Sequence, residues 1–429
     1  MTPRELALRL LLRAETNDQF LNISLDHALS ESGMSDADRA LTATLVYGVT
    51  ERRLLLDYQI RALSSRPDGE LDPKVRNALR LGLYQLICLD RIPPHAAINE
   101  SVSLVPRKAS GFVNAILRAY TRDPGLRLPD PDKDPVEYLS VRYSVCPPLC
   151  RRLLTDLGRQ ETEAFLASLE TVPPTTLAVN TLRISREDLA SHIEGSTPTL
   201  YSPGGLRVKG AVRALYGFEE GLFFVQDEAS QICVAALDAQ PGETVIDVCS
   251  CPGSKSFGAA ISMQNRGRVL SYDLHQKKLP LIESGAKRLG ITIITAAARD
   301  GRDPIPELFE SADCVLCDVP CSGFGVLAKK PELRYKDPKT SEALPRIQRD
   351  ILENACRYLR VGGILVYSTC TVLPEENGQN VKAFLEAHPE FAPVPFSVGE
   401  LSAESGMITL MPHRHGTDGF FVAKLRRIR

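Results

Sequence analysis

Residues 243–256, ETVIDVCSCPGSKS, decide the fold class of the larger part of this chain. A short apolar strand ends at Asp247, a loop of small residues follows, and a helix is expected from Lys255. Further short apolar runs alternate with helical patterns downstream: RVLSYD (268–273), ITIITAA (291–297), DCVLCDV (313–319), GGILVYST (362–369) and GFFVAKL (419–425). This alternation predicts an α/β domain with a parallel, doubly wound sheet over residues 239–429.

Two regions of different pattern precede this domain. Residues 1–128 show helical periodicity almost throughout and predict an all-helical bundle of five to seven helices. Prolines and aspartates alternate in LPDPDKDP, which cannot continue a helix, so residues 129–135 are expected to form a linker. Residues 136–238 mix helix and strand patterns and predict a small α+β domain.

The bulk composition narrows the class of protein. The chain has 429 residues, of which 43% are hydrophobic and 24% charged, as in ordinary globular proteins. A net charge of −2 gives no overall basic field, so any surface that binds nucleic acid has to be local. Charged residues interrupt the N-terminal segment MTPRELALRLLLRAE, which excludes a signal peptide and a membrane span there. We therefore expect a cytoplasmic protein whose eleven cysteines are thiols.

The loop after Asp247 predicts a ligand site. Small residues let a ligand approach the backbone, and the first turn of the next helix offers N–H groups. The loop is not a GxGxxG dinucleotide fingerprint. Asp273 ends the second strand, where a carboxylate suits ribose hydroxyls, and Asp300 follows the third strand and suits an adenine amine.

Each of these aspartates alone is explained equally well as a cap of the next helix or turn. Together they lie at the carboxyl edge, where such sheets bind ligands, and they fit a nucleoside that carries no phosphates. S-adenosylmethionine is therefore the expected cofactor.

Most of the cysteines are predicted to be packing residues. Cys314 and Cys317 point to opposite faces of one strand, because side chains alternate along a strand, so they cannot share a metal ion. Cys249 and Cys251 lack a second pair at zinc spacing, and no metal site is expected. Five cysteines have no chemical context: Cys88, Cys146, Cys150, Cys233 and Cys356.

Cys321 and Cys370 differ from the others. Each lies just past the carboxyl end of a strand, and the two strands are expected to be neighbours, so both thiols would face the cofactor cleft. Pro374 predicts the start of a helix, and a nearby helix N-terminus favours a thiolate. From these patterns alone, each of the two is either a nucleophile or a packing residue.

These residues resemble those of the RNA cytosine-C5 methyltransferases, in particular the bacterial 16S rRNA enzymes of the RsmB/Sun/Fmu type. The resemblance rests on four motifs that occur in the same order, the last two being highly specific together: DVCSCPGSKS (247–256), SYDLHQKK (271–278), DVPCSGFG (318–325) and STCTVLPEEN (368–377). FFVQDEAS (223–230) resembles the family segment before the cofactor loop.

The N-terminal region is similar to the RNA-binding domain of the antitermination factor NusB. The similarity rests on YGVTERRLLLD (47–57), LRLGLYQL (79–86) and GFVNAILR (111–118). A NusB-like start separates this type from shorter relatives, so the resemblance covers nearly the whole chain.

The resemblance implies a Rossmann-like catalytic domain that uses S-adenosylmethionine to methylate C5 of a cytosine in 16S rRNA. Asp273 would hold the ribose and Asp300 the adenine, and Asp318 would lie at the cofactor and beside the substrate base. Cys370 would be the nucleophile, and Cys321 would assist product release. The loop that would enclose the methionine end comprises Cys249, Ser250, Cys251, Pro252, Gly253, Ser254 and Lys255.

The cofactor loop departs from the usual family sequence CAAPGGKT. Ser250 and Cys251 replace alanines, and Ser254 replaces a glycine. If the backbone at residue 254 requires a positive φ, the serine is expected to weaken cofactor binding.

The substrate of such chemistry is an unstacked base, so the expected partner is single-stranded small-subunit rRNA, naked or in an early assembly intermediate. Residues 329–350 carry seven Lys/Arg against four Asp/Glu and are a candidate RNA contact, as is the terminal KLRRIR. In isolation, such a charge run is better explained as a solvated surface. We expect a monomer with neither a membrane nor a metal partner.

Two alternatives stay open: methylation of another rRNA or tRNA site, and a non-catalytic RNA-binding or ribosome-assembly protein on a degenerate methyltransferase scaffold. A DNA cytosine methyltransferase would use the Pro-Cys thiol as its nucleophile and would lack the Thr-Cys thiol. The presence of both Cys321 and Cys370 argues against it.

Overall fold

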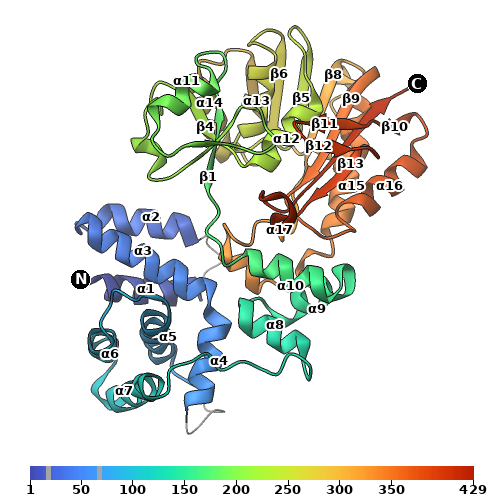
Figure 1. The fold of residues 1–429 in the computed structure, drawn as a ribbon. Coiled ribbons are helices and arrows are strands. Elements are labelled where there is room, and N and C mark those ends of the chain that lie inside the picture. Colours follow the sequence, from blue (N-terminus) through green and yellow to red (C-terminus); the bar gives the residue numbers. More distant parts are fainter. Residues whose placement is uncertain (16–20, 65–69) are drawn as a thin grey trace. The chain divides into compact units, whose positions relative to one another are not determined.

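The computed structural model describes residues 1–15, 21–64 and 70–429 (Figure 1). Contacts divide the chain into two compact units. The first comprises residues 1–170 and 327–338, and the second comprises residues 171–326 and 339–429. These two units do not coincide with the predicted domains, whose limits are at residues 128, 135 and 238. The predicted limits stay predictions.

The first unit is helical. Its described elements are α1 (Pro3–Ala14), α2 (Leu21–Glu31), α3 (Asp36–Glu51), α4 (Arg53–Leu63), α5 (Pro73–Cys88), α6 (Pro94–Ser103), α7 (Arg107–Arg122), α8 (Pro135–Tyr143), α9 (Pro147–Leu157), α10 (Arg159–Ser168) and the 3-10 helix η4 (Pro331–Tyr335). Seven of these helices begin before residue 128, at the upper end of the predicted range. Leucine is the commonest residue in the core of this bundle, with Leu6 of α1, Leu45 of α3 and Leu79 of α5 among its members.

A small antiparallel sheet opens the second unit, with strand order β2-β3-β1-β4. Its strands are β1 (Thr175–Val179), β2 (Thr197–Pro198), β3 (Gly205–Val208) and β4 (Phe223–Val225). Helix α11 (Arg186–His192) covers a small core that includes Leu177, Leu189 and Phe223. The predicted mixture of helices and strands in this region is confirmed.

The large sheet of the second unit has the order β10-β14-β9-β8-β5-β6-β7, with β13 pairing outside this path on β14. Its parallel strands are β5 (Thr244–Asp247), β6 (Arg268–Asp273), β7 (Ile294–Ala298), β8 (Ala312–Asp318) and β9 (Leu359–Thr369). Its antiparallel strands are β10 (Phe391–Pro393), β13 (Met407–Leu410) and β14 (Phe420–Arg427). The predicted parallel sheet is found in the five strands from β5 to β9, and GFFVAKL is a strand as expected. This last strand, β14, pairs antiparallel with β9, which the sequence did not predict.

The remaining elements of the second unit include those that cover the large sheet or follow its strands. They are α12 (Glu228–Leu237), α13 (Ser254–Ser262), α14 (Leu279–Leu289), α15 (Leu344–Ala355), α16 (Gly378–Ala387), α17 (Pro412–His415), the hairpin β11 (Phe396–Val398) and β12 (Leu401–Ala403), and the 3-10 helices η1 (Val212–Ala214), η2 (Gln276–Lys278), η3 (Pro306–Leu308), η5 (Pro338–Ser341) and η6 (Cys356–Tyr358). No helix among the described residues is long and apolar enough to cross a membrane.

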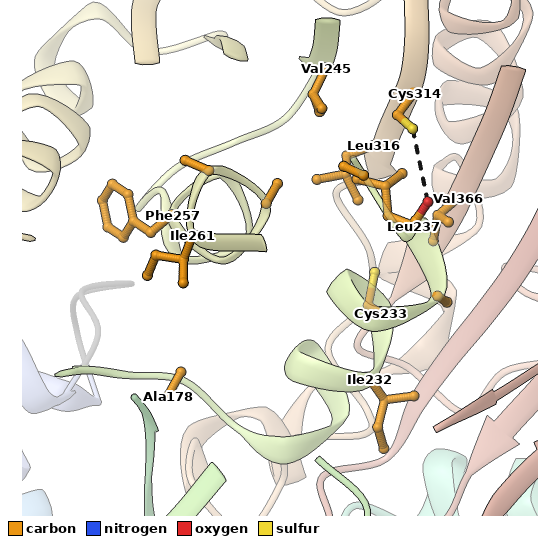
Figure 2. Packing of buried hydrophobic residues seen from close by; sticks show 14 of the residues in the cluster. Ala178, Ile232, Cys233, Leu237, Val245, Phe257, Ile261, Cys314, Leu316 and Val366 are labelled. Carbon is orange, nitrogen blue, oxygen red and sulfur yellow. Dashed lines mark hydrogen bonds between the residues drawn. The ribbon is translucent and has the colours of Figure 1, made fainter. Parts of the chain in front are cut away.

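Figure 2 shows how α12 packs on the large sheet. Cys233 and Leu237 of α12 face Leu316 and Val366 of the neighbouring strands β8 and β9. The Cys314 thiol lies 3.9 Å from the Leu237 carbonyl oxygen, and its side chain belongs to the same buried cluster. This packing holds one face of the sheet whose carboxyl edge carries the candidate site.

Candidate active site

The loop of residues 249–255, the predicted cofactor loop, turns sharply at Gly253, directly before α13. Gly253 has φ +107°, and a Cβ there would lie 2.7 Å from Cζ of Phe257, so only glycine fits without strain. No side chain caps this helix start. Ser254 is not among the residues with positive φ, so the backbone strain expected of its side chain is absent.

The two other substitutions in the loop also fit. The amide N–H and the hydroxyl of Ser250 donate to the Tyr272 carbonyl oxygen at 2.8 and 3.0 Å. The amide of Cys251 donates to Oδ2 of Asp273 at 3.2 Å. The loop is therefore tied to the end of β6, and the Ser250 hydroxyl adds a bond that alanine would lack.

The three aspartates lie at the ends of adjacent parallel strands, as predicted, because β5 pairs with β6 and β6 with β7. Asp273 accepts hydrogen bonds from the amides of Cys251 and His275. Asp300 is held by the Arg302 guanidinium, with Nη2 at 2.6 Å from Oδ2, and this bond lowers the pKa of Asp300.

Asp247 plays a different part, because it is only 1% exposed. Burial raises its pKa to about 7, against the effect of the Ser256 hydroxyl, which donates to Oδ2 at 2.6 Å. Ser271 donates in turn to Ser256 at 2.8 Å. Ser256 in the first turn of α13 thus links Asp247 at the end of β5 to Ser271 of β6 within the core.

Asp318 ends β8 and lies beside Lys255. The Lys255 ammonium donates to Oδ2 of Asp318 at 2.7 Å, and the Ser368 hydroxyl donates to Oδ1 at 2.6 Å. Burial disfavours the charged ammonium, but the neighbouring carboxylate of Asp318 outweighs it and raises the pKa of Lys255. The cofactor loop and the end of β8 are therefore linked by a charged contact.

Cys321 and Cys370 are brought together, as the sequence predicted. Strands β8 and β9 are parallel neighbours, and the two Sγ atoms lie 3.2 Å apart. The Cys370 amide also donates to the Cys321 sulfur at 3.3 Å. The hydrogen bond with the Cys370 thiol, followed by burial, raises the pKa of Cys321 well above its ordinary value.

The predicted helix start at Pro374 is wrong. Helix α16 begins at Gly378, and residues 374–377 form a turn in which the amides of Asn377 and Gln379 donate to the Pro374 carbonyl. Proline fits a turn as well as the first turn of a helix. The argument that a helix start at Pro374 activates Cys370 therefore fails.

Five of the seven cysteines predicted to be packing residues are buried, whereas Cys88 and Cys146 are only half-buried. Cys314 and Cys317 belong to two separate buried clusters on opposite faces of the sheet. Cys150, Cys233 and Cys356 are buried.

Sequence reasoning missed two buried residues beside Cys321, namely Gln348 and Glu376. Glu376 belongs to the quoted motif STCTVLPEEN, but no sequence signal distinguished it from the exposed carboxylates of other turns. Gln348 lies in the middle of an amphipathic helix and carried no signal.

The basic segment 329–350 does not act as one surface. Arg334 is only 4% exposed, and its guanidinium donates to the carbonyl oxygens of Leu327, Glu51 and Leu169. Of the seven basic residues, Arg334 is therefore unavailable to RNA, while Lys329 and Lys330 are exposed.

Comparisons with known proteins decide the family. The model of the NusB family matches residues 1–122, and the model "16S rRNA methyltransferase RsmB/F" matches residues 234–426. "Probable ribosomal RNA small subunit methyltransferase B" of Bacillus subtilis is 36% identical over 99% of this chain and 98% of its own. The chain belongs to the ribosomal RNA small subunit methyltransferase B family. A member from Citrobacter koseri is 33% identical over 91% of both chains.

Structural comparison agrees with this membership. The crystal structure of PH0851 covers 99% of both chains with a TM-score of 0.79 and 28% identity. The expected NusB-type helical region, the Rossmann-like domain and the assignment to the RNA methyltransferases are confirmed for this member of the methyltransferase B family.

Proposed function

We propose that this methyltransferase transfers a methyl group from S-adenosylmethionine to C5 of a cytosine in 16S rRNA, at cytosine 967, through a covalent bond between Cys370 and C6. The observation that carries the proposal is the 3.2 Å separation of the Cys321 and Cys370 sulfurs, beside Asp318, at the carboxyl edge of the sheet.

The residues of the cofactor loop fit S-adenosylmethionine. Gly253 lets the loop turn at φ +107°, the start of α13 has no side-chain cap, and the carboxylates of Asp273 and Asp300 suit ribose hydroxyls and an adenine amine. Residues 249–255 would hold the methionine end, with Asp318 close by. When bound, the cofactor supplies an electrophilic methyl group.

The proposed reaction begins with Cys370. Its thiolate adds to C6, and the electron pair of the C5–C6 double bond makes C5 nucleophilic toward the methyl group. Two oxygens of Asp318 accept from Lys255 and Ser368, and their further lone pairs suit the exocyclic amine of the base, which donates. Asp318 would thereby orient the cytosine beside Cys370.

Cys321 would complete the reaction. After methyl transfer, the proton on C5 has to leave so that the C5–C6 double bond re-forms and the bond from C6 to Cys370 breaks. The hydrogen bond with the Cys370 thiol contributes most to the raised pKa of Cys321. Once Cys370 is bonded to carbon, that cause is gone, so Cys321 ionises more easily at the step where a base is needed.

The proposed substrate is naked or early-assembly rRNA, which places the reaction in the cytoplasm. Exposed Lys329 and Lys330 follow the Pro-Cys loop closely in the chain and are proposed phosphate contacts. The alternatives are another rRNA or tRNA cytosine, and a non-catalytic assembly protein. A titration with S-adenosylmethionine separates the last of these, because a degenerate scaffold would bind no cofactor.

Bisulfite sequencing tests the proposed function. We expect one protected cytosine in 16S rRNA to disappear in a deletion strain and to return with the wild-type gene but not with Cys370→Ala. Cys370→Ala should still bind the cofactor, because its thiol acts on the base. An identical pattern in the deletion strain would refute the proposed substrate, and protection restored by Cys370→Ala would refute the nucleophile.

A further inference from the structure

Glu376 is a buried carboxylate close to the proposed catalytic thiols. It is 1% exposed and lies six residues after Cys370. Its Oε2 accepts from the amide of Ser322 at 2.9 Å and from Nε2 of Gln348 at 2.7 Å. Its Oε1 is buried without a hydrogen-bond partner among the described residues. Burying a carboxylate costs free energy, and the two hydrogen bonds to Oε2 offset part of that cost.

Gln348 and Glu376 together form a hydrogen-bonded bracket, which holds the backbone on both sides of Cys321. Gln348 lies on α15, is fully buried, and its Nε2 also donates to the Pro320 carbonyl oxygen at 3.0 Å. The backbone groups on both sides of Cys321, the Pro320 carbonyl and the Ser322 amide, are therefore held by one Gln348–Glu376 pair.

The Gln348–Glu376 pair is also bonded to β9, the strand that directly precedes Cys370. The Tyr367 hydroxyl of β9 donates to the Glu376 carbonyl oxygen at 2.7 Å, and Oε1 of Gln348 lies 3.3 Å from the same hydroxyl. The hydroxyls of Ser322 and Thr371 lie 2.7 Å apart and form a second link between the two cysteine loops. These links determine how the Cys321 sulfur faces Cys370.

We propose that Glu376 and Gln348 are positioning residues that hold Cys321 for removal of the C5 proton, an inference that rests on the proposed function. Neither residue needs to touch the substrate. If the bracket is lost, Cys370 still adds to C6 and the methyl group still moves. The C5 proton then leaves slowly, because a displacement of about 1 Å can cost about a hundredfold in rate.

The variants that test this remove different hydrogen bonds around Cys321. Glu376→Ala removes both bonds to Oε2, and Gln348→Met removes both donated bonds at similar volume. In Glu376→Gln, the amide oxygen can replace Oε2 as acceptor for both donors, while the amide nitrogen takes the place of the unpartnered Oε1. Glu386→Ala on α16 removes an exposed carboxylate and serves as the control.

The experiment is a single turnover of full-length enzyme with in vitro transcribed 16S rRNA and methyl-labelled S-adenosylmethionine. It follows the label entering RNA and the decay of the covalent protein–RNA adduct on denaturing gels. We expect Glu376→Ala and Gln348→Met to slow adduct decay at least tenfold and to change label transfer less than threefold. Glu376→Gln and Glu386→Ala should behave like the wild type.

Adduct decay at the wild-type rate in both Glu376→Ala and Gln348→Met would overturn the proposal, as would a Glu376→Gln variant as slow as Glu376→Ala. If Glu376→Ala does not fold, Gln348→Met and Glu376→Gln decide the question by the same criterion. Failure of the wild-type enzyme to label cytosine C5 in rRNA would instead refute the proposed function.

Discussion

Lys255 and Asp318 form an ion pair, with Nζ 2.7 Å from Oδ2, that joins the first turn of α13 to the carboxyl end of β8. The ammonium also lies 5.1 Å from the centre of the Phe420 ring. Lys255 is only 8% exposed, so its charge depends on these neighbours. One contact thus connects the proposed cofactor loop to the residue proposed to hold the base.

Asp318→Asn should therefore destabilise the fold as well as impair catalysis. Leaving a buried ammonium without its carboxylate is expected to cost about 3 kcal/mol of unfolding free energy, measured by urea denaturation. The double variant Lys255→Met/Asp318→Asn should recover part of that loss. Arg360→Met, which removes the exposed partner of Asp313, should cost less than about 1 kcal/mol. Equal losses in Asp318→Asn and Arg360→Met would contradict the account.

Substitution at Gly253 should impair the protein, whereas substitution of Ser254 by the usual family residue, glycine, should have no effect. Gly253→Ala forces a side chain into φ +107° and against Phe257, so we expect a loss of about 1–3 kcal/mol in stability and weaker cofactor binding. Ser254→Gly should leave affinity for S-adenosylmethionine unchanged in calorimetric titration, because residue 254 needs no positive φ. A clear gain in affinity for Ser254→Gly would show that the serine does hinder the cofactor.

Sequence patterns were most informative at the ends of the parallel strands. Asp273, Asp318, Cys321 and Cys370 were placed correctly, because strand period and small-residue loops are local signals. The antiparallel insertion of β14 beside β9 was not predictable, since pairing of residues more than 50 positions apart leaves no local pattern. The same holds for Glu376 and Gln348, whose partners are remote in the chain.

Short strands and turns were the other elements that the sequence patterns did not predict correctly. The strands β10, β11, β12 and β13 have only three or four residues each, too few for an alternating pattern. Pro374 was misjudged because proline is typical of both a turn and a helix start.

Asp273→Ala should weaken binding of S-adenosylmethionine by about 1.5–3 kcal/mol, the range for a hydrogen bond to a charged group. The carboxylate also holds the Cys251 and His275 amides, so the loop should loosen too. Isothermal titration calorimetry measures the change, with Asp303→Ala, an exposed carboxylate, as the control. Unchanged affinity in Asp273→Ala would show that the residue is only a turn cap.

Asp247 predicts a pH dependence of stability. Its pKa is about 7 in the folded protein, because of burial, and about 3.9 when unfolded. The folded state holds a proton that the unfolded state releases, so this contribution is complete below about pH 4 and is lost as the pH rises through 7. Three pKa units correspond to on the order of 4 kcal/mol.

Asp247→Asn removes that dependence. Relative to the wild type, the unfolding free energy of the variant should therefore rise between about pH 4 and pH 8 in urea titrations. Asp300→Asn should show its difference from the wild type as a loss of stability that is present at neutral pH and fades in acid, because the pKa of Asp300 is lowered by Arg302. A pH-independent difference for Asp247→Asn would mean that the carboxyl is not protonated in the fold.

The covalent adduct of Cys321→Ala tests the central claim most directly. In this variant Cys370 can add to C6 and the methyl group can move, but the C5 proton cannot be removed, so the enzyme should stay bonded to its RNA. After mixing with 16S rRNA and S-adenosylmethionine, a shifted band is expected on a denaturing gel, and it should vanish in Cys321→Ala/Cys370→Ala. Free turnover of Cys321→Ala without an adduct, or an adduct that survives the loss of Cys370, would contradict the assignment of the two thiols.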